Sequence, residues 1–371
     1  MKSSYERMPS LKFTYKRLFI ISAFLLSLMG ILFIYSAGTY WSSIHYEGQM
    51  PFYLKQLIYL ILAIAVFLTV ANMPTFTMEK TWITLYVFSL ILLVLVLVPG
   101  IGLVRNGSQS WIGLGPLTIQ PAELAKITTL MYLSFLLGKV KNDERVVQIK
   151  HFLIIILPCA LIMLQPDFGS VFILVVSAFI LLFIARYPIK LYVGFIVMGV
   201  IGLIALIASA PYRLKRIEAF INPWEDPLGS GFQAVQSLLA IGPAGLLGHG
   251  FQESRQKFLY LPEPQNDFIF SIILEEIGFL GGCVVLVLFG LFIYSGCGLA
   301  LQSLKSSDFY AISALVGMVG FQACLNIGVV IGLIPVTGVT LPFISYGGTS
   351  LMIIWFVVAI VVGFANRTNS V

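Results

Sequence analysis

Long apolar runs with few charges dominate this sequence and restrict it to membranes. A helix needs about 20 apolar residues to cross the hydrocarbon core of a bilayer, and ten runs approach or exceed that length. Hydrophobic residues make up 59% of the chain and charged residues 10%, whereas soluble domains carry about 25% charged residues. We therefore expect an all-α, polytopic membrane protein with about ten transmembrane helices, at residues 18–37, 52–71, 82–98, 119–137, 151–164, 168–185, 191–210, 268–297, 309–334 and 346–365.

The shortest of these runs, residues 151–164, is the weakest prediction. Its length also fits a re-entrant segment. The loops at 138–150 and 186–190 are both basic, however, and basic loops favour the cytoplasm. We therefore expect the segment between them to cross the membrane and return.

The distribution of basic residues predicts the orientation of the chain. Fourteen of the 22 lysines and arginines lie at the two termini and in the loops on the same side as the termini, so both termini are expected in the cytoplasm. Most of the others lie in one large extracellular loop, residues 211–267, whose length exempts it from this rule.

A basic leader, residues 1–17, precedes the first run and resembles a signal sequence. The run after it is too long for an ordinary signal-peptide core. We expect an uncleaved first span, although Ser36, Ala37 and Gly38 leave cleavage possible, and we treat residues 1–371 as a single membrane domain.

The sequence contains no motif for a metal site, a redox site or a nucleotide-binding site. The four cysteines lie in apolar segments without metal or redox spacing, and the three histidines lie far apart. No Walker lysine follows the glycines between Gly242 and Gly250, and no nucleotide-binding domain is visible. Since most basic residues flank membrane spans, we expect membrane lipids as contacts and no nucleic-acid partner.

Two charged residues fall inside the fourth predicted span. Glu123 and Lys126 are three residues apart, so they share one face of a helix and can neutralise each other. They are either a structural ion pair or part of a cavity or pathway, and the cost of burying charges in lipid favours the second interpretation.

Asp167 stands between two predicted spans, in the run Gln165 to Gly169. It suits the N-cap of the next helix, and a cap near the membrane boundary carries no large desolvation cost. Capping and a functional role are equally compatible with this position.

The large loop contains bases interleaved with apolar residues between Pro211 and Phe220. This pattern suits an amphipathic interfacial helix that contacts lipid headgroups. Alternatively, Arg213 and Arg216 help to hold an anionic lipid pyrophosphate, because guanidinium groups match phosphate geometry. We prefer the interpretation that this segment contacts lipid headgroups, unless another motif supports a pyrophosphate substrate.

The best candidate for a catalytic group is Asp267, where the extended run Ser254–Asn266 meets a long apolar helix. The N-terminus of a helix favours the carboxylate form, which suits a general base and equally suits a helix cap, and position alone favours the cap. Glu275 and Glu276 lie roughly 12 to 14 Å deeper, and Glu275 is nearer the Asp267 face. We assign Glu275 to the substrate cavity and rank both glutamates below Asp267 as catalytic groups, because a substrate headgroup would stay near the wet surface. Alternatively, either glutamate pairs with another helix.

Several motifs in this order resemble those of the SEDS family (shape, elongation, division and sporulation), represented by FtsW, RodA and SpoVE. The resemblance covers nearly all ten spans and is closest to the division and sporulation branch. Its landmarks are residues 106–115, 120–126, 165–169, 222–224, 231–233, 261–270 and 342–348.

The resemblance implies an inverting peptidoglycan glycosyltransferase that polymerises lipid II in division or sporulation. It implies that the protein works with a class B penicillin-binding protein and other division or sporulation proteins. The expected location is the bacterial cytoplasmic membrane at the division or sporulation septum. A divalent cation, Mg²⁺ or Mn²⁺, is implied by the family's chemistry, with unknown ligands.

The family's residue roles transfer onto matching positions of this chain. Asp267 takes the place of the catalytic aspartate, and Glu123, Lys126 and Asp167 that of a buried polar cluster. Trp111 falls in the family's outer-loop motif, where we assign it to cavity shape or lipid contact. Ser110 departs from the pattern, since many relatives carry a basic residue there.

Two other functions fit the same pattern of spans. Many spans with intramembrane charges and Gly/Pro breaks also suit a transporter that flips lipid II. A non-catalytic division scaffold is the third class, although it would not require costly charges within the membrane.

Overall fold

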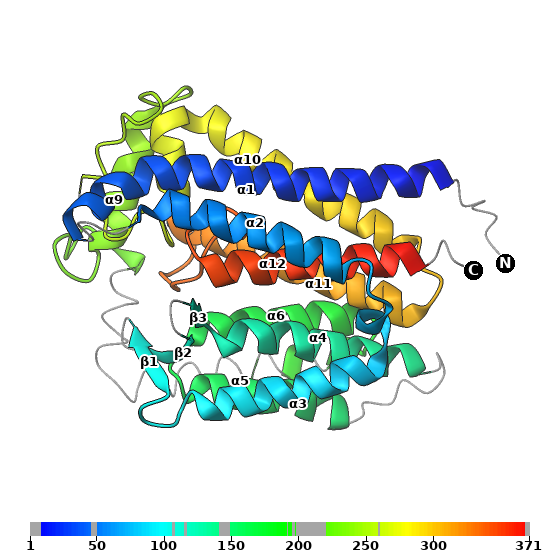
Figure 1. The fold of residues 1–371 in the computed structure, drawn as a ribbon. Coiled ribbons are helices and arrows are strands. Elements are labelled where there is room, and N and C mark those ends of the chain that lie inside the picture. The colour runs from blue at the N-terminus through cyan, green and yellow to red at the C-terminus, as the bar shows by residue number, and fades with distance from the viewer. Residues whose placement is uncertain are drawn as a thin grey trace.

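The chain forms a bundle of long helices with a small sheet at one end (Figure 1). The structure is a computed structural model that describes residues 9–45, 50–105, 108–114, 117–140, 149–190, 192–194, 197, 220–258 and 260–367. Its elements in chain order are α1 (Pro9–His45), α2 (Phe52–Val70), η1 (Pro74–Thr77), α3 (Glu79–Leu95), β1 (Gly102–Arg105), β2 (Ser108–Leu114), β3 (Leu117–Ile119), α4 (Pro121–Lys139), α5 (Ile149–Met163), α6 (Phe168–Ile184), α9 (Phe232–Ile241), η3 (Gly242–Ala244), α10 (Ile269–Leu301), α11 (Ser306–Val330) and α12 (Gly348–Arg367).

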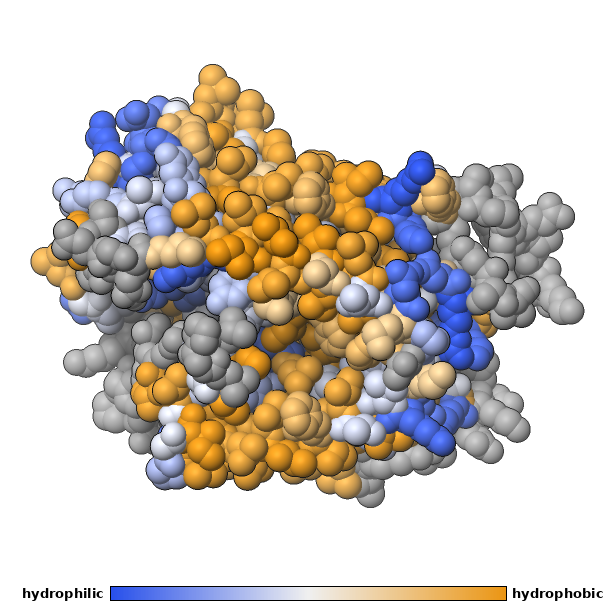
Figure 2. Space-filling view, in the orientation of Figure 1, coloured by the Kyte–Doolittle hydropathy of each residue, from blue (hydrophilic) through white to orange (hydrophobic). Residues whose placement is uncertain are grey.

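The long helices run side by side and define two ends of the molecule. The start of α1 and the end of α12 lie together at one end, the terminal end (Figure 1). The sheet, α9 and the start of α10 lie at the opposite end, the loop end. An apolar belt separates these two more hydrophilic ends on the face shown in Figure 2, which is the surface that a bilayer requires.

Nine of the ten predicted spans correspond to helices in the described part of the chain. The tenth, residues 191–210, lies almost entirely outside the described residues. Among the described residues, five helices are long and apolar enough to cross a membrane, and α5 and α6 are shorter apolar helices. The weakest prediction, residues 151–164, is α5, a helix packed against α3, α4 and α6.

The three-stranded sheet was not expected from the sequence, which predicted only helices. Its strands are antiparallel in the order β1-β2-β3. Ile119, the predicted start of the fourth span, instead ends β3, and α4 begins at Pro121, because proline fits the first turn of a helix. The Ser108 hydroxyl donates to the Gln165 carbonyl, so the sheet is attached to the turn between α5 and α6.

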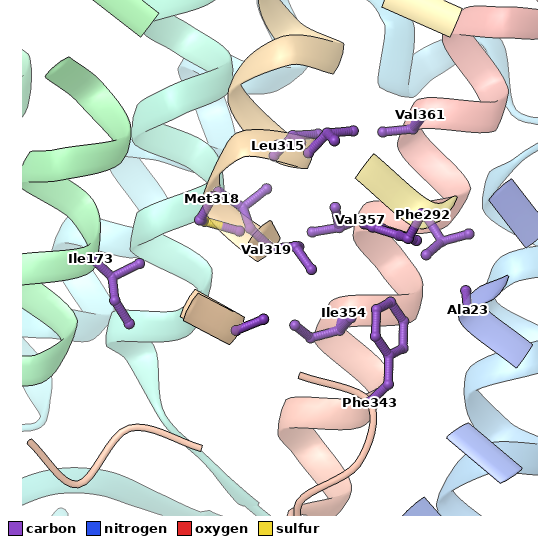
Figure 3. Packing of buried hydrophobic residues seen from close by; sticks show 14 of the residues in the cluster. Ala23, Ile173, Phe292, Leu315, Met318, Val319, Phe343, Ile354, Val357 and Val361 are labelled. Carbon is purple, nitrogen blue, oxygen red and sulfur yellow. The ribbon is translucent and has the colours of Figure 1, made fainter. Parts of the chain in front are cut away.

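The segment between α11 and α12, residues 331–347, enters the core at the loop end; we name it the α11–α12 loop. Phe343 packs edge-on against Phe292 of α10, with ring centroids 5.3 Å apart, and lies near Ile354 of α12 (Figure 3). Gly30 of α1 is also close, since a Cβ there would come within 2.7 Å of the Phe343 carbonyl. The loop is therefore held by three helices.

The long helix α10 is broken at Gly278, which has φ 66° and ψ −167°. Glycine tolerates this positive φ without steric cost. A break inside an apolar span frees backbone groups that must find partners, and the segment 245–250 supplies them. The four bonds are His249 N to Glu275 O (2.9 Å), Gly250 N to Glu276 O (2.9 Å), Phe279 N to Gly245 O (3.0 Å) and Leu280 N to Leu246 O (3.1 Å).

Candidate active site

Asp267 lies at the loop end, two residues before the start of α10. The N-cap residue of α10 is Phe268, and no side chain caps this helix. The Asp267 side chain is half-buried, and in the described part of the chain its carboxylate makes no hydrogen bond or ion pair. The geometry thus contradicts the helix-cap interpretation and leaves the carboxylate available for chemistry.

The surroundings of Asp267 favour its protonated form more than water does. Burial raises the pKa of Asp267 from 3.8 to about 6, and the negative charge of Glu263 contributes in the same direction. A base with a pKa near the working pH is well matched to accept and release a proton.

The Asp267 backbone is fixed by α11 and the α11–α12 loop. The Asn326 side-chain amide on α11 donates to the carbonyls of Asp267 and Val339, both at 2.7 Å. Gly338 has φ 70°, and a Cβ there would lie 3.7 Å from Asp267 Oδ2. The carboxylate therefore lies against the middle of this loop.

Asp167 is the N-cap of α6 and also contacts the segment before α4. Its carboxylate accepts from the Ser170 backbone N–H at 3.0 Å and from the Ser170 hydroxyl at 2.7 Å. Gln120 donates to the same carboxylate at 2.8 Å. A Cβ at Gly169 would come within 3.0 Å of the Thr337 carbonyl, so this turn packs against the same loop as Asp267. The capping interpretation of Asp167 is confirmed.

Glu123 and Lys126 form an ion pair at 2.8 Å, which was the less favoured of the two interpretations; their role in a cavity or pathway stays a prediction. Lys126 is fully buried, and its ammonium also lies 3.4 Å from the Gln322 side-chain oxygen. Gln322 in turn donates to the Thr340 carbonyl at 3.1 Å. The pair is thus connected to the α11–α12 loop one residue beyond the carbonyl that Asn326 holds.

The α11–α12 loop therefore connects four predicted site residues that are far apart in the sequence, namely Asp267, Asp167, Glu123 and Lys126. Gln322 and Asn326 complete these connections, and neither residue was predicted from the sequence. Two amides four residues apart share a helix face, and their presence in an apolar span is a signal that could have found them.

Glu275 lies apart from this cluster, and its carboxylate is hydrogen bonded to groups of the large loop. It is buried, and its carboxylate accepts from the Ser254 hydroxyl at 2.5 Å and from the backbone N–H groups of Arg255 (2.9 Å) and Gln256 (3.4 Å). Its contacts anchor the large loop. A substrate role for Glu275 stays a prediction that these contacts do not support.

The remaining predicted residues lie in or beside the loops. Trp111 is half-buried on β2, opposite Leu103. Arg213 and Arg216 lie outside the described residues, so their predicted contact with phosphate stays a prediction.

A protein-only metal cage is absent from the described residues, where no three His, Cys, Asp or Glu residues gather closely enough to hold an ion. Mg²⁺ commonly needs fewer protein ligands, because it binds one or two carboxylates together with substrate phosphates and waters. Glu263, whose carboxylate accepts from the Asn266 amide at 2.6 Å and acts electrostatically on Asp267, fits that mode.

A bundle of membrane-crossing helices with a half-buried aspartate at one end, unpaired within the described residues, defines a polytopic membrane protein with an ionisable group at its rim. Comparison with known proteins agrees with this class. The family model described as "Cell cycle protein", for FtsW, RodA and SpoVE, matches residues 16–370. The chain belongs to this family.

Individual relatives match over nearly the full chain. Stage V sporulation protein E of Bacillus subtilis (strain 168) is 42% identical over 356 residues, which are 95% of this chain and 97% of that protein. A probable peptidoglycan glycosyltransferase FtsW of Legionella pneumophila is 34% identical over 366 residues, 96% of this chain and 92% of that protein.

Solved structures share the fold. A chain from a study of the structural coordination of polymerization and crosslinking by a peptidoglycan synthase complex has a TM-score of 0.75 and 29% identity, and covers 94% of this chain and 97% of that chain. The rod shape determining protein RodA of Thermus thermophilus has a TM-score of 0.68 and 28% identity, with 94% and 96% covered.

Proposed function

We propose that this protein is an inverting peptidoglycan glycosyltransferase that polymerises lipid II. Relatives that match over most of the chain carry the name peptidoglycan glycosyltransferase, and a structural neighbour belongs to a peptidoglycan synthase complex. The single structural observation that supports the activity is the carboxylate of Asp267. It does not cap α10, it lies against the α11–α12 loop, and its pKa is about 6.

In the proposed reaction, the 4-hydroxyl of one lipid-linked sugar attacks the anomeric carbon of another. A new carbon–oxygen bond forms there while the bond to the lipid pyrophosphate breaks, and the pyrophosphate leaves. Asp267 accepts the proton of the attacking hydroxyl, a contribution of typically 10²- to 10⁴-fold. Both substrates already lie in the membrane, which lowers the entropic cost of bringing them together.

We also propose that a divalent cation, Mg²⁺ or Mn²⁺, takes part. Glu263 would hold it together with pyrophosphate oxygens, and the bound cation would neutralise the charge that develops on the leaving group. Arg213 and Arg216 are proposed to assist from the large loop, because guanidinium groups bind phosphate oxygens well.

The proposed orientation places the loop end outside the cell and both termini in the cytoplasm. The basic residues of the termini and same-side loops support this orientation. We propose that residues 211–267 form the large outer loop and that the protein acts in the cytoplasmic membrane at the division or sporulation septum. A class B penicillin-binding protein, which makes the peptide cross-links, is the proposed partner, together with other division or sporulation proteins.

The test is a polymerisation assay with purified protein and lipid II in detergent. It compares four conditions, with and without the cognate penicillin-binding protein and with and without Mg²⁺ or Mn²⁺, and glycan products are separated on a gel. The proposal expects ladders of glycan strands under at least one condition. No ladder under any condition, together with movement of labelled lipid II across vesicles that contain the protein, would indicate transport instead.

A further inference from the structure

The side-chain amide of Asn326 is the only polar side chain in the described residues that is hydrogen bonded to the Asp267 backbone. It lies on α11 and is almost completely buried, at 1% exposure. Its two amide hydrogens serve two carbonyls, those of Asp267 and Val339, each at 2.7 Å. This side chain thus joins Asp267 to the α11–α12 loop. Two neighbouring bonds join the preceding residues to the same loop, from the Ser345 hydroxyl to the Asn266 carbonyl and from the Tyr346 N–H to the Gln265 carbonyl, both at 2.8 Å.

The orientation of this amide follows from its partners. A carbonyl oxygen can only accept, so the nitrogen of Asn326 must face both carbonyls and its oxygen must point away. That oxygen is buried and has no hydrogen-bond partner within the described residues, and the Thr337 hydroxyl nearby in the same loop is in the same state. An unpaired buried acceptor costs free energy. The site therefore satisfies the two carbonyls at the expense of the amide oxygen.

A second amide on α11 shows what is special about the first. Gln322, one turn away, donates to the Thr340 carbonyl at 3.1 Å and so holds the same loop. Within the described residues it makes no hydrogen bond to Asp267. Of the side chains described, only Asn326 is hydrogen bonded to both the loop and the Asp267 backbone. This difference distinguishes a residue that supports the loop from one that also supports the candidate base.

We propose that Asn326 is a positioning residue of the reaction, which acts by clamping the Asp267 backbone to the α11–α12 loop so that the carboxylate faces the substrate. The inference rests on the proposed glycosyltransferase function. The carboxylate has no hydrogen bond of its own in the described residues, so its direction is set by its backbone and by packing. Loss of the clamp moves the base relative to the attacking hydroxyl, and a misplacement of about 1 Å can lower a rate roughly 100-fold.

The kinetic test uses Asn326→Ala and Asn326→Asp. The second variant keeps the size of the side chain and, when ionised, offers no donor to either carbonyl. Both should lower kcat roughly 10- to 100-fold, with little change in the KM for lipid II. Asn366→Ala is the matched control, because it removes an amide-to-carbonyl bond to Ala71 at the terminal end and should leave kcat unchanged.

The structural test is hydrogen–deuterium exchange of the same proteins. Asn326→Ala should speed exchange in residues 266–272 and in the α11–α12 loop. Gln322→Ala should speed exchange in the loop alone, because the described hydrogen bonds of Gln322 go to Lys126 and Thr340 and not to Asp267.

Two results would overturn the proposal: parental kcat in the folded Asn326 variants, or unchanged exchange in residues 266–272. If the parent protein fails to polymerise lipid II, the glycosyltransferase proposal falls, and with it the role of Asn326 in that reaction. Faster exchange in residues 266–272 would then still establish the clamp itself.

Discussion

Two acidic residues near the start of α10 differ in the hydrogen bonds that their carboxylates make. Asp267 and Glu275 are eight residues apart, and both were candidates for the site. The Asp267 carboxylate has no hydrogen bond within the described residues, whereas Glu275 accepts three from the segment 254–256. A carboxylate saturated by backbone and hydroxyl donors is a structural anchor, while one that is half-buried and unpaired is available to a substrate.

Glu276 extends this contrast. It is completely buried, accepts a hydrogen bond from Ser36 of α1, and lies 3.8 Å from the ammonium of Lys257. Together with Glu275 it ties the large loop to α1 and α10. Glu275 and Glu276 therefore hold the large loop in place, whereas Asp267 is available to react with a substrate.

The largest expected effect comes from Asp267→Asn. The substitution removes the proton acceptor, so the polymerisation rate should fall roughly 10²- to 10⁴-fold. Thermal stability should not fall, because Asp267 caps no helix, and above about pH 6 it should rise, because the substitution removes a carboxylate whose ionised form the fold disfavours. Rates from glycan gels and melting temperatures in detergent provide the two measurements. Glu253→Gln, an exposed acid of the same loop, is the matched control, and a parental rate in Asp267→Asn would refute the base assignment.

The second effect concerns the buried pair Glu123 and Lys126. Lys126→Ala leaves Glu123 without its partner and should destabilise the protein by about 3–5 kcal/mol. The double variant Glu123→Lys/Lys126→Glu keeps one charge of each sign and should retain more folded protein. The amount of monodisperse protein after purification and its melting temperature measure this difference. Equal losses in both variants would show that the pair is more than a simple ion pair.

A smaller effect on stability is expected for Glu275→Ala. Removal of the carboxylate leaves the Ser254 hydroxyl and two backbone N–H groups without their acceptor, at a cost of about 1–3 kcal/mol. The melting temperature should fall, and limited proteolysis should cut residues 250–258 more readily. The chemical step should be affected much less than in Asp267→Asn. A stable Glu275→Ala protein that cannot polymerise would instead place Glu275 among the groups that act on the substrate.

The smallest effect is a shift in the pH profile. Asp267 works as a base only when deprotonated, and its pKa is raised to about 6, so activity should be full above that pH and fall as the pH drops through it. Glu263→Gln removes the second cause of the raised pKa, so the pKa of Asp267 in the metal-free protein should move to a lower value. Infrared titration of the carboxyl group in metal-free protein measures this shift without a cation on Glu263, and an unchanged pKa would exclude the electrostatic influence of Glu263.

The positions of the apolar helices were determined by the sequence alone, whereas α9, within the large loop, was not predicted. In the described part of the chain nine of the ten predicted spans correspond to helices, because a run of about 20 apolar residues is a local property that the bilayer requires of each helix separately. The cap at Asp167 was among the alternatives for the same reason, since capping depends on neighbouring residues. Asp267 was found through its motif and its position at the start of a helix.

The roles of the polar residues were decided by the tertiary structure. Capping and catalysis were both open for Asp267, and only the start of α10 at Ile269 and the absence of a bonded partner separated them. Glu275 was assigned to the substrate because helical periodicity gives the face of a helix but not what packs there. Gln322 and Asn326 were missed because their partners, Thr340, Val339 and Asp267, are brought to them by long-range packing. Hydrogen bonds between segments depend on which segments meet in space, and hydrophobic periodicity carries no information about that.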